Sequence, residues 1–164
     1  SLKQGKGEAI GGCRGETGKG NNIFSPVSLT FDKRSARTAA AMLLTLPGMR
    51  IVNFRELALV DLVLIVLSKK AVRKGVFSLV QATSNTGNLV AWKYTRGKQR
   101  ILIAANFGLQ QTTGDIICDD ATGTKKIEMT DILTQTIYKR DPKELRENGL
   151  TVILYQYEIQ IFEY

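Results

Sequence analysis

The sequence predicts a mainly β protein, an antiparallel β-sandwich of about eight strands with Greek-key-like connections, preceded by a short helical α/β segment. Two observations support this fold class. From residue 77 onward, short runs that alternate apolar and polar residues are separated by turns rich in Gly, Asn and Asp, which is typical of a sandwich or barrel. Before that point, two longer apolar blocks have the composition of helices. We therefore expect three parts: a glycine-rich tail or loop at 1–24, a helical segment at 25–76, and the sandwich at 77–164.

The N-terminal stretch has the composition of a loop. Residues 1–22 contain seven glycines and few apolar side chains, so they cannot bury enough surface to offset the entropy lost on ordering. Within them, GETGKGNN resembles a phosphate-binding loop, which needs Gly, four residues and then Gly-Lys-Ser/Thr. Cys13 stands where the first Gly should be, and Gly20 replaces the Ser or Thr. We expect no nucleotide or other cofactor here.

A helix is predicted over residues 32–46, followed by a short strand. Asp32 or Ser35 can cap its N-terminus, and the run AAAMLL consists of good helix formers. Pro47 cannot continue the helix and restricts the residue before it. The apolar stretch MRIVNF that follows has the composition of a strand.

A second helix is predicted over residues 56–74, and it is apolar on almost every side. Its C-terminal end carries the cations Lys69, Lys70, Arg73 and Lys74. Cations in a last turn followed by glycine are typical of a helix C-terminus. Because a helix without a polar face needs cover on several sides, the two helices must be buried on the sandwich, on each other or on another chain. We therefore expect self-association or a partner chain.

The eight strand candidates follow in close succession. They are residues 77–81, 88–95, 99–107, 114–119, 125–130, 131–138, 150–155 and 157–163. The clearest hairpin is YTRGKQR, where Gly97 can adopt the positive φ that a tight turn requires. The stretch RDPKELRENG is assigned to a turn, and YQY near the end of the chain is a candidate turn as well.

The charge is distributed unevenly. The formal net charge is +8 and the pI about 9.6, and the excess of Lys and Arg lies in the first 100 residues, whereas the rest of the chain is acidic. A basic module for nucleic acid or another polyanion is therefore one functional hypothesis. Its contacts would be Lys69, Lys70, Arg73, Lys74, Lys93, Arg96, Lys98 and Arg100. Nucleic acid is the less favoured partner, because no run of cations exceeds two residues.

Several classes of site and location are disfavoured by composition. The chain has no His and two cysteines, Cys13 and Cys118, so zinc sites and histidine acid–base catalysis are excluded. The two cysteines are expected to be unrelated thiols, although a pair between them stays open. The most apolar run, 57–67, is much shorter than the ~20 residues that span a bilayer, and no signal peptide is visible. We expect a cytoplasmic protein that does not enter membranes.

The order of several motifs resembles the C-terminal end of the α-amylase family of glycoside hydrolases. A helix ends in LLTLPGMRIV, and a further helix precedes the strands. The motifs that match the family's C-terminal sandwich are Trp92-Lys93-Tyr94, Asn106-Phe107, Asp131-Ile132-Leu133 and Ile161-Phe162-Glu163. The resemblance covers residues 31–164. It implies the end of a (β/α)8 barrel followed by a β-sandwich C-domain.

The resemblance carries no catalytic residue with it. A barrel of this type has ~250 residues, and most of it has no counterpart here. The family's nucleophile and acid/base carboxylates lie on those absent strands. Its third carboxylate lies in an NHD segment, where this chain has NNIFSPVSLTF. Glycoside hydrolysis needs two facing carboxylates, and the acidic candidates are Asp115, Asp119, Asp120, Glu128 and Asp131. We interpret them as solvated turn acids, and expect no catalytic or metal-binding residues.

Trp92 and Tyr94 are the candidate glycan contacts, because they share one face of a predicted strand. Aromatic pairs of this kind hold sugars in many sandwich domains, but we favour the alternative that they face the core. Three functional hypotheses follow. The first is a non-catalytic accessory or structural module related to α-amylase-type enzymes, with weak glucan binding. The others are the basic polyanion module and one half of a glycosidase completed in trans.

Overall fold

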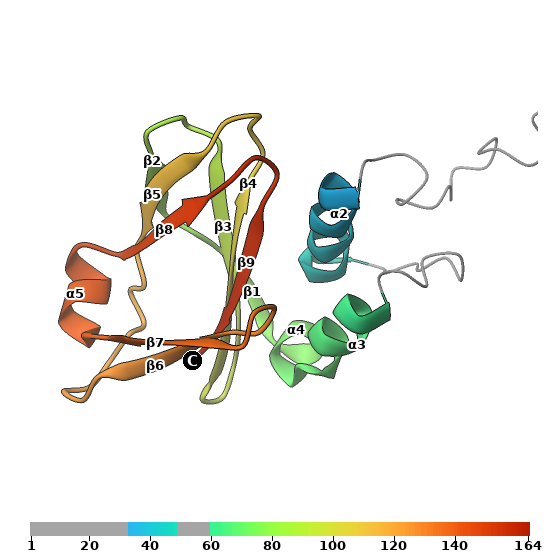
Figure 1. The fold of residues 1–164 in the computed structure, drawn as a ribbon. Coiled ribbons are helices and arrows are strands. Elements are labelled where there is room, and N and C mark those ends of the chain that lie inside the picture. Colours follow the sequence, from blue (N-terminus) through green and yellow to red (C-terminus); the bar gives the residue numbers. More distant parts are fainter. Residues whose placement is uncertain (1–32, 49–59) are drawn as a thin grey trace, which may run out of the picture.

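The computed structural model describes residues 33–48 and 60–164 (Figure 1). The predicted tail, the predicted strand after Gly48, the first part of the predicted second helix and Cys13 lie outside these ranges. The helices are α2 (Lys33–Thr45), α3 (Val60–Ser68), α4 (Lys70–Lys74) and α5 (Pro142–Glu147). The strands are β1 (Val76–Val80), β2 (Ala82–Ser84), β3 (Leu89–Arg96), β4 (Gln99–Asn106), β5 (Thr112–Ile116), β6 (Ile127–Asp131), β7 (Thr136–Arg140), β8 (Leu150–Leu154) and β9 (Ile159–Glu163).

The strands form two antiparallel sheets. The larger sheet has six strands in the order β1-β3-β4-β9-β6-β7, and the smaller has three in the order β2-β5-β8. The β3–β4 hairpin turns at Gly97, whose φ is 58°, as the sequence predicts. Strand β9 lies between β4 and β6, so residues from the end of the described chain complete the middle of the larger sheet.

The two sides of the sandwich differ. On one side β1 and β2 are separated only by Gln81, so the chain passes directly from the larger sheet to the smaller one. The amide of Ile117 donates to the Gln81 carbonyl at 3.0 Å and fixes this passage. On the other side β7 and β8 are the edge strands of their sheets, and helix α5 connects them (Figure 1). The sandwich is therefore closed along β1–β2 and open between β7 and β8.

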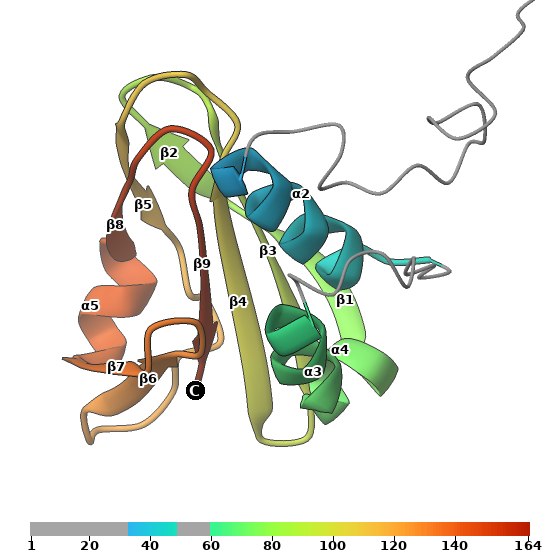
Figure 2. The ribbon, with the colours of Figure 1, turned by 45° about the vertical axis from the view of Figure 1, so that its right-hand side comes forward.

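The six-stranded sheet is the middle of three layers. Helices α2, α3 and α4 lie on one face and the three-stranded sheet on the other (Figure 2). Alternate residues of β4 serve the two cores: Ile101 and Ile103 pack toward the helices, and Leu102 and Ala104 pack between the sheets. This strand is an almost continuous apolar run because both of its faces are buried.

Two side-chain hydrogen bonds tie helix α2 to the sandwich, one to a strand and one to a turn. The indole Nε1 of Trp92 donates to the Thr45 carbonyl at 3.2 Å, which satisfies one of the carbonyls left unpaired at a helix end. Nearer the middle of the helix, the Thr38 hydroxyl donates to the Tyr157 carbonyl, in the turn between β8 and β9. The sequence did not decide which surface covers the apolar faces of the helices. In the structure these faces are buried in part on the larger sheet.

The predicted fold class, mainly β with antiparallel sheets, is confirmed, and several element boundaries differ from the predicted ones. The single helix expected over 56–74 breaks at Lys69 into α3 and α4 within its described part. The strand predicted over 131–138 is a tight turn followed by β7, because Asp131 Oδ1 accepts from the Leu133 amide and Gln135 adopts φ of 61°. The turn predicted at RDPKELRENG contains α5, and the short strand β2 was not expected.

None of the helices in the described parts of the chain is long and apolar enough to cross a membrane. Within the same residues, no group of three or more His, Cys, Asp and Glu side chains is placed to hold a metal ion.

Candidate functional site

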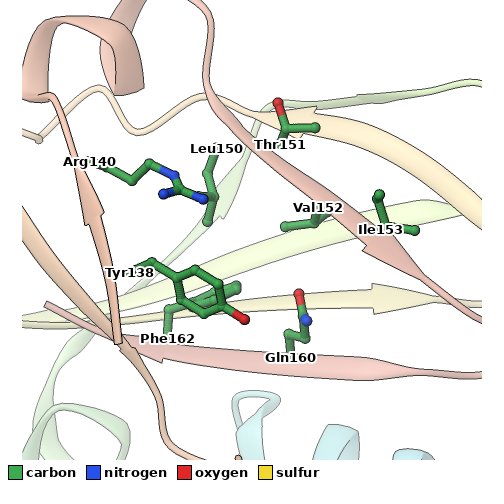
Figure 3. A pocket seen from close by; sticks show the side chains of 8 residues that line it. All are labelled: Tyr138, Arg140, Leu150, Thr151, Val152, Ile153, Gln160 and Phe162. Atoms are coloured by element: carbon green, nitrogen blue, oxygen red, sulfur yellow. The ribbon is translucent and has the colours of Figure 1, made fainter. Parts of the chain in front are cut away.

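A groove opens between the edge strands β7 and β8, and residues of β9 also line it (Figure 3). Its volume is about 270 Å³. The residues that line it are Tyr138, Arg140, Leu150, Thr151, Val152, Ile153, Gln160 and Phe162. It occupies the open side of the sandwich, and its size lies near the lower end of ligand pockets.

Strand alternation turns Tyr138 and Arg140 toward the groove together, because residues two apart on a strand share a face. The Tyr138 ring meets the Phe162 ring edge to face, with centroids 6.0 Å apart. The guanidinium carbon of Arg140 lies 5.4 Å from the centre of the Tyr138 ring, within the range of a cation–π contact. The Phe162, Tyr138 and Arg140 side chains therefore form a stack that runs from the core to solvent.

The groove combines an apolar floor with polar groups at its rim. Leu150, Val152 and Phe162 are buried and form the floor. Neither the Tyr138 hydroxyl nor the Gln160 amide has a hydrogen-bond partner among the described residues, and both lie on the groove (Figure 3). Such unpaired polar groups beside apolar surface are what a small polar ligand needs for orientation.

A second cluster of polar side chains lies where the β5–β6 connection crosses β3 and β4. Lys93 Nζ is 2.6 Å from Asp119 Oδ1 and 3.3 Å from Asp120 Oδ1. Arg100 Nε is 2.9 Å from Asp120 Oδ2, and the Tyr164 hydroxyl donates to Asp120 Oδ1 at 3.0 Å. Because these charges are matched within the cluster, the arrangement clamps the connection to the larger sheet and presents no spare reactive group.

The pKa values in this cluster follow from the pairing. Burial alone would raise the pKa of Asp120, but the charge of Lys93 and the hydrogen bonds from Tyr164, Lys93 and Arg100 outweigh it, so the pKa is lowered. Burial alone would lower the pKa of Lys93, but Asp119 and Asp120 reverse this and raise it. Burial raises the pKa of the neighbouring Cys118 thiol to about 11. Cys118 is therefore a buried, unreactive thiol at neutral pH.

Trp92 and Tyr94, the aromatic residues proposed from the sequence as glycan contacts, are core residues in the structure. They are 1% and 3% exposed and pack between the larger sheet and the helices. The Phe77 ring contacts the Tyr94 ring edge to face at 5.5 Å. Neither ring presents a face to solvent, so the glycan hypothesis cannot rest on these two residues. The core position favoured for them from the sequence agrees with this burial.

The eight cations proposed for polyanion binding separate into two groups. Lys69 Nζ lies 2.5 Å from Glu163 Oε2, and Lys93 and Arg100 belong to the cluster described above. The other five have no acidic partner within salt-bridge distance among the described residues: Lys70, Arg73, Lys74, Arg96 and Lys98. Arg96 Nη1 donates to the Lys74 carbonyl at 3.1 Å, so α4 and the β3–β4 turn lie together. Polyanion binding at these five residues stays a prediction.

The remaining acidic candidates do not form a facing pair. Asp115 on β5 accepts from the Thr151 hydroxyl at 2.6 Å, and Glu128 on β6 pairs with Lys139 at 3.0 Å. Asp131 is buried at the end of β6, where its Oδ1 accepts from the Leu133 amide at 2.9 Å. Asp119 and Asp120 both turn to Lys93. Each of these carboxylates thus has a local structural partner.

The groove residues Tyr138, Arg140 and Gln160 were not predicted as functional from the sequence. Their signal is the alternation Tyr-x-Arg in a short strand that ends before a proline. That pattern does not show which face of the strand is covered, because the cover comes from β8, which belongs to the other sheet, and from β9, which does not pair with β7. Only the sheet topology brings the three side chains to one opening.

Similarity to known proteins is found by structure and not by sequence. No protein-family model matches the chain, and no curated protein matches it by sequence. Among solved structures, a noncanonic maltogenic alpha-amylase from Thermotoga neapolitana is similar, with a TM-score of 0.64, 13% identity, and coverage of 82% of this chain and 37% of that one. The alpha-amylase from Geobacillus thermoleovorans, solved with acarbose, is similar with a TM-score of 0.59 and 16% identity. The match covers 84% of this chain and 34% of that one.

A third similar structure is the debranching enzyme from Nostoc punctiforme, with a TM-score of 0.53, 16% identity, and coverage of 80% of this chain and 29% of that one. The chain thus spans about a third of the length of these proteins. Identities this low speak for the fold alone. The described residues have the fold of the C-terminal part of α-amylase family members.

Proposed function

We propose that the protein is a non-catalytic accessory module, related to α-amylase-type glycoside hydrolases, that binds a short saccharide in the groove between β7 and β8. The observation that carries the proposal is the pair of unpartnered polar groups, the Tyr138 hydroxyl and the Gln160 amide, beside the apolar floor of Val152 and Phe162. Sugars present hydroxyls at their edges and apolar C–H faces, so they complement a site of this composition.

The mode of contact follows from the stack at Tyr138. Phe162 packs against this ring and the Arg140 guanidinium lies over it, so the ring has little free face for a sugar to stack on. Recognition therefore rests on hydrogen bonds from the rim, and a small groove of this kind should bind weakly, with dissociation constants of about a millimolar. The solved structures of similar enzymes with acarbose support a saccharide as the ligand class.

Isothermal titration with maltooligosaccharides tests the proposal. Tyr138→Phe and Gln160→Ala should each weaken binding by about fivefold to tenfold, because each removes one hydrogen bond worth about 1 kcal/mol. Tyr155→Phe is the matched control, because it removes a phenol hydroxyl from an exposed position outside the groove. Binding that is unchanged in both groove variants, or no heat with any saccharide, would contradict the proposal.

A second candidate function is completion of a longer enzyme in trans. The outer side of the helical layer carries large exposed apolar side chains, with Leu43 on α2 at 59% and Leu64 on α3 at 63% exposed. The similar structures are about three times as long as the part that this chain matches. Exposed leucines on neighbouring helices are a candidate interface, and the N-terminal part of such an enzyme is the partner that the match suggests.

This second function is tested by mixing. The chain should restore hydrolysis of a glucan to a Geobacillus thermoleovorans α-amylase that lacks its matching C-terminal part. Leu43→Glu with Leu64→Glu should abolish the restoration, because a charge cannot be buried without a partner. Leu109→Glu is the control, since Leu109 is 69% exposed and lies outside the helices. Equal activity with both variants would show that these leucines are not the interface.

A further inference from the structure

Arg140 is the charged residue of the groove, and its charge is not matched. No carboxylate lies within salt-bridge distance of it among the described residues. Of its donor groups, Nη1 donates to the Lys139 carbonyl at 3.2 Å. The other guanidinium N–H groups make no hydrogen bond within the described chain. A guanidinium has five N–H donors, so most of them are available to a ligand.

The guanidinium is also held in place before any ligand arrives. Its contact with the Tyr138 ring, and the contact of that ring with buried Phe162, connect it to the core of the sandwich. Figure 3 shows the Arg140 and Tyr138 side chains extending from β7 toward the same space as Gln160. An arginine fixed on an aromatic ring loses less conformational entropy on binding than a free surface arginine does.

The residues that line the groove give it a positive charge. Arg140 is the one cation among the eight lining residues, and none of the eight is acidic. Two acids on the strands beside the lining strands have partners of their own: Asp115 on β5 accepts a hydrogen bond from Thr151, and Glu128 on β6 pairs with Lys139. A positive group at the rim of a partly apolar groove favours an anionic ligand over a neutral one. The planar fork of arginine matches a carboxylate in particular.

We propose that the groove prefers an acidic saccharide, with the carboxylate of a uronic acid bound to the Arg140 guanidinium. This inference rests on the proposed function and names the substrate class of the same site. The Tyr138 hydroxyl and the Gln160 amide then bind the hydroxyls of the ring, and its C–H face lies on Val152. The volume of about 270 Å³ suits a short end of the saccharide and leaves the rest in solvent. A saccharide uses the uncharged hydrogen-bonding groups of the rim, which a simple anion leaves unpaired.

Two saccharides of equal length test the inference. Tetragalacturonate and maltotetraose are titrated into the full chain by calorimetry at low salt. The acidic saccharide should bind about tenfold more tightly, since a charge-assisted hydrogen bond is roughly twice as strong as a neutral one. Arg140→Gln should remove this preference, because the loss of affinity for tetragalacturonate should exceed the loss for maltotetraose by about tenfold. Arg140→Lys should recover part of the preference, because lysine keeps the charge but lacks the fork.

Lys139→Gln is the matched control. It removes the same charge from the next residue of β7, whose side chain is exposed and pairs with Glu128 instead of lining the groove. It should leave both affinities unchanged. Thermal unfolding of each variant checks that the fold is retained.

The possible outcomes distinguish a failure of the inferred preference for acidic saccharides from a failure of the proposed saccharide binding. Equal affinities for the two saccharides, insensitive to Arg140→Gln, would overturn the preference and leave the proposed function standing. An equal loss with Lys139→Gln and Arg140→Gln would also overturn it, by showing an effect of net charge. A tetraglutamate peptide that binds as tightly as tetragalacturonate would overturn the saccharide assignment. No binding of either saccharide would contradict the proposed function itself.

Discussion

Asn106 shows how one side chain can hold several loops together. Its amide Nδ2 donates to the carbonyls of Gln110, Leu154 and Tyr155 at 2.7, 3.2 and 2.9 Å. Its Oδ1 accepts from the Gly108 amide at 2.8 Å. The side chain is buried and satisfies backbone groups in the segment after β4 and at the end of β8. The Asn-Phe motif that resembles the α-amylase family in sequence is therefore a structural junction.

We expect Asn106→Ala to lower the free energy of unfolding by about 3 kcal/mol, because it removes a buried side chain that makes four hydrogen bonds to the backbone. Urea denaturation measures the change. Gln110→Ala is a suitable control, since only the backbone carbonyl of Gln110 takes part and its side chain is exposed. A loss below about 1 kcal/mol in Asn106→Ala would mean that water replaces the amide.

The free energy of unfolding should depend on pH through Asp120. Its pKa in the folded protein lies below the ordinary value of 3.8, owing to Lys93, Tyr164 and Arg100. The stabilisation is therefore fully present above pH 3.8 and is lost as the pH falls through the lower folded pKa. Asp120→Asn should be less stable than the parent chain at neutral pH, and this difference should shrink below that value.

Urea midpoints of both proteins at about pH 7 and about pH 3 measure the difference. Asp119→Asn provides the comparison, because Asp119 pairs with the same Lys93 but its side chain is 75% exposed, and exposed pairs contribute little. A pH-independent difference for Asp120→Asn would show that the carboxylate is not held ionised by the cluster.

At the scale of elements, α5 shows what local sequence can specify. Asp141 caps the helix, with Oδ1 accepting from the amides of Lys143 and Glu144 at 2.8 and 3.3 Å. Pro142 occupies the first helical position, where its missing N–H costs nothing. On the inner face of α5, Leu145 packs into the core between the sheets. Capping and burial together let a helix of six residues form.

Asp141→Ala should destabilise the protein by about 1 kcal/mol through loss of this cap. Asp141→Ser should retain most of the stability, since a serine hydroxyl accepts the same bonds. Thermal unfolding followed by circular dichroism compares the two. If serine costs as much as alanine, the role of Asp141 is not that of a cap.

The prediction from sequence succeeded where the signal was local and failed where it depended on pairing. The β3–β4 hairpin follows from Gly97 between two alternating runs, and α2 follows from its alanines and Pro47. The helix α5 was missed although Asp141 and Glu144 form a capping signature, because its length and its proline suggested a turn. The short strand β2 has no pattern of its own, and only pairing with β5 makes it a strand.

The candidate site lies beyond local prediction for the same reason. Its side chains come from β7, β8 and β9, and their convergence depends on which edges the two sheets leave open. The burial of Trp92 likewise depends on a helix that precedes it by 47 residues. A sequence pattern identifies aromatic residues on one strand face, and the cover over that face decides between a core and a binding site.

At the scale of the whole molecule, the helices and the sandwich share a core. Trp92, Ile103 and Ile161 of the larger sheet pack in one cluster with Ala41, Leu44 and Val66 of the helices. The boundary predicted near residue 76 therefore divides the chain in sequence, whereas the apolar contacts run across it. Cores of this kind unfold cooperatively in small proteins.

Thermal unfolding should therefore show one transition by two probes. The fluorescence of Trp92, the single tryptophan, reports on the contact with the helices, and far-ultraviolet circular dichroism reports on the whole chain. Leu44→Ala, on α2, should lower both midpoints equally, with a cost of about 2–4 kcal/mol for the buried side chain. Separate midpoints would show that the helical layer detaches before the sandwich unfolds.

The position of β9 has a consequence for the order in which the molecule is made. Strands β3 and β4 are neighbours in sequence and can pair as soon as both are synthesised. Strand β9 fills the gap between β4 and β6, so these two halves of the larger sheet cannot join until residue 163 has left the ribosome. Until then one edge of β4 has unpaired backbone N–H and C=O groups, and the strand exposes apolar side chains. A nascent chain of this protein should thus depend on chaperone binding at β4, and that dependence should end when β9 is added.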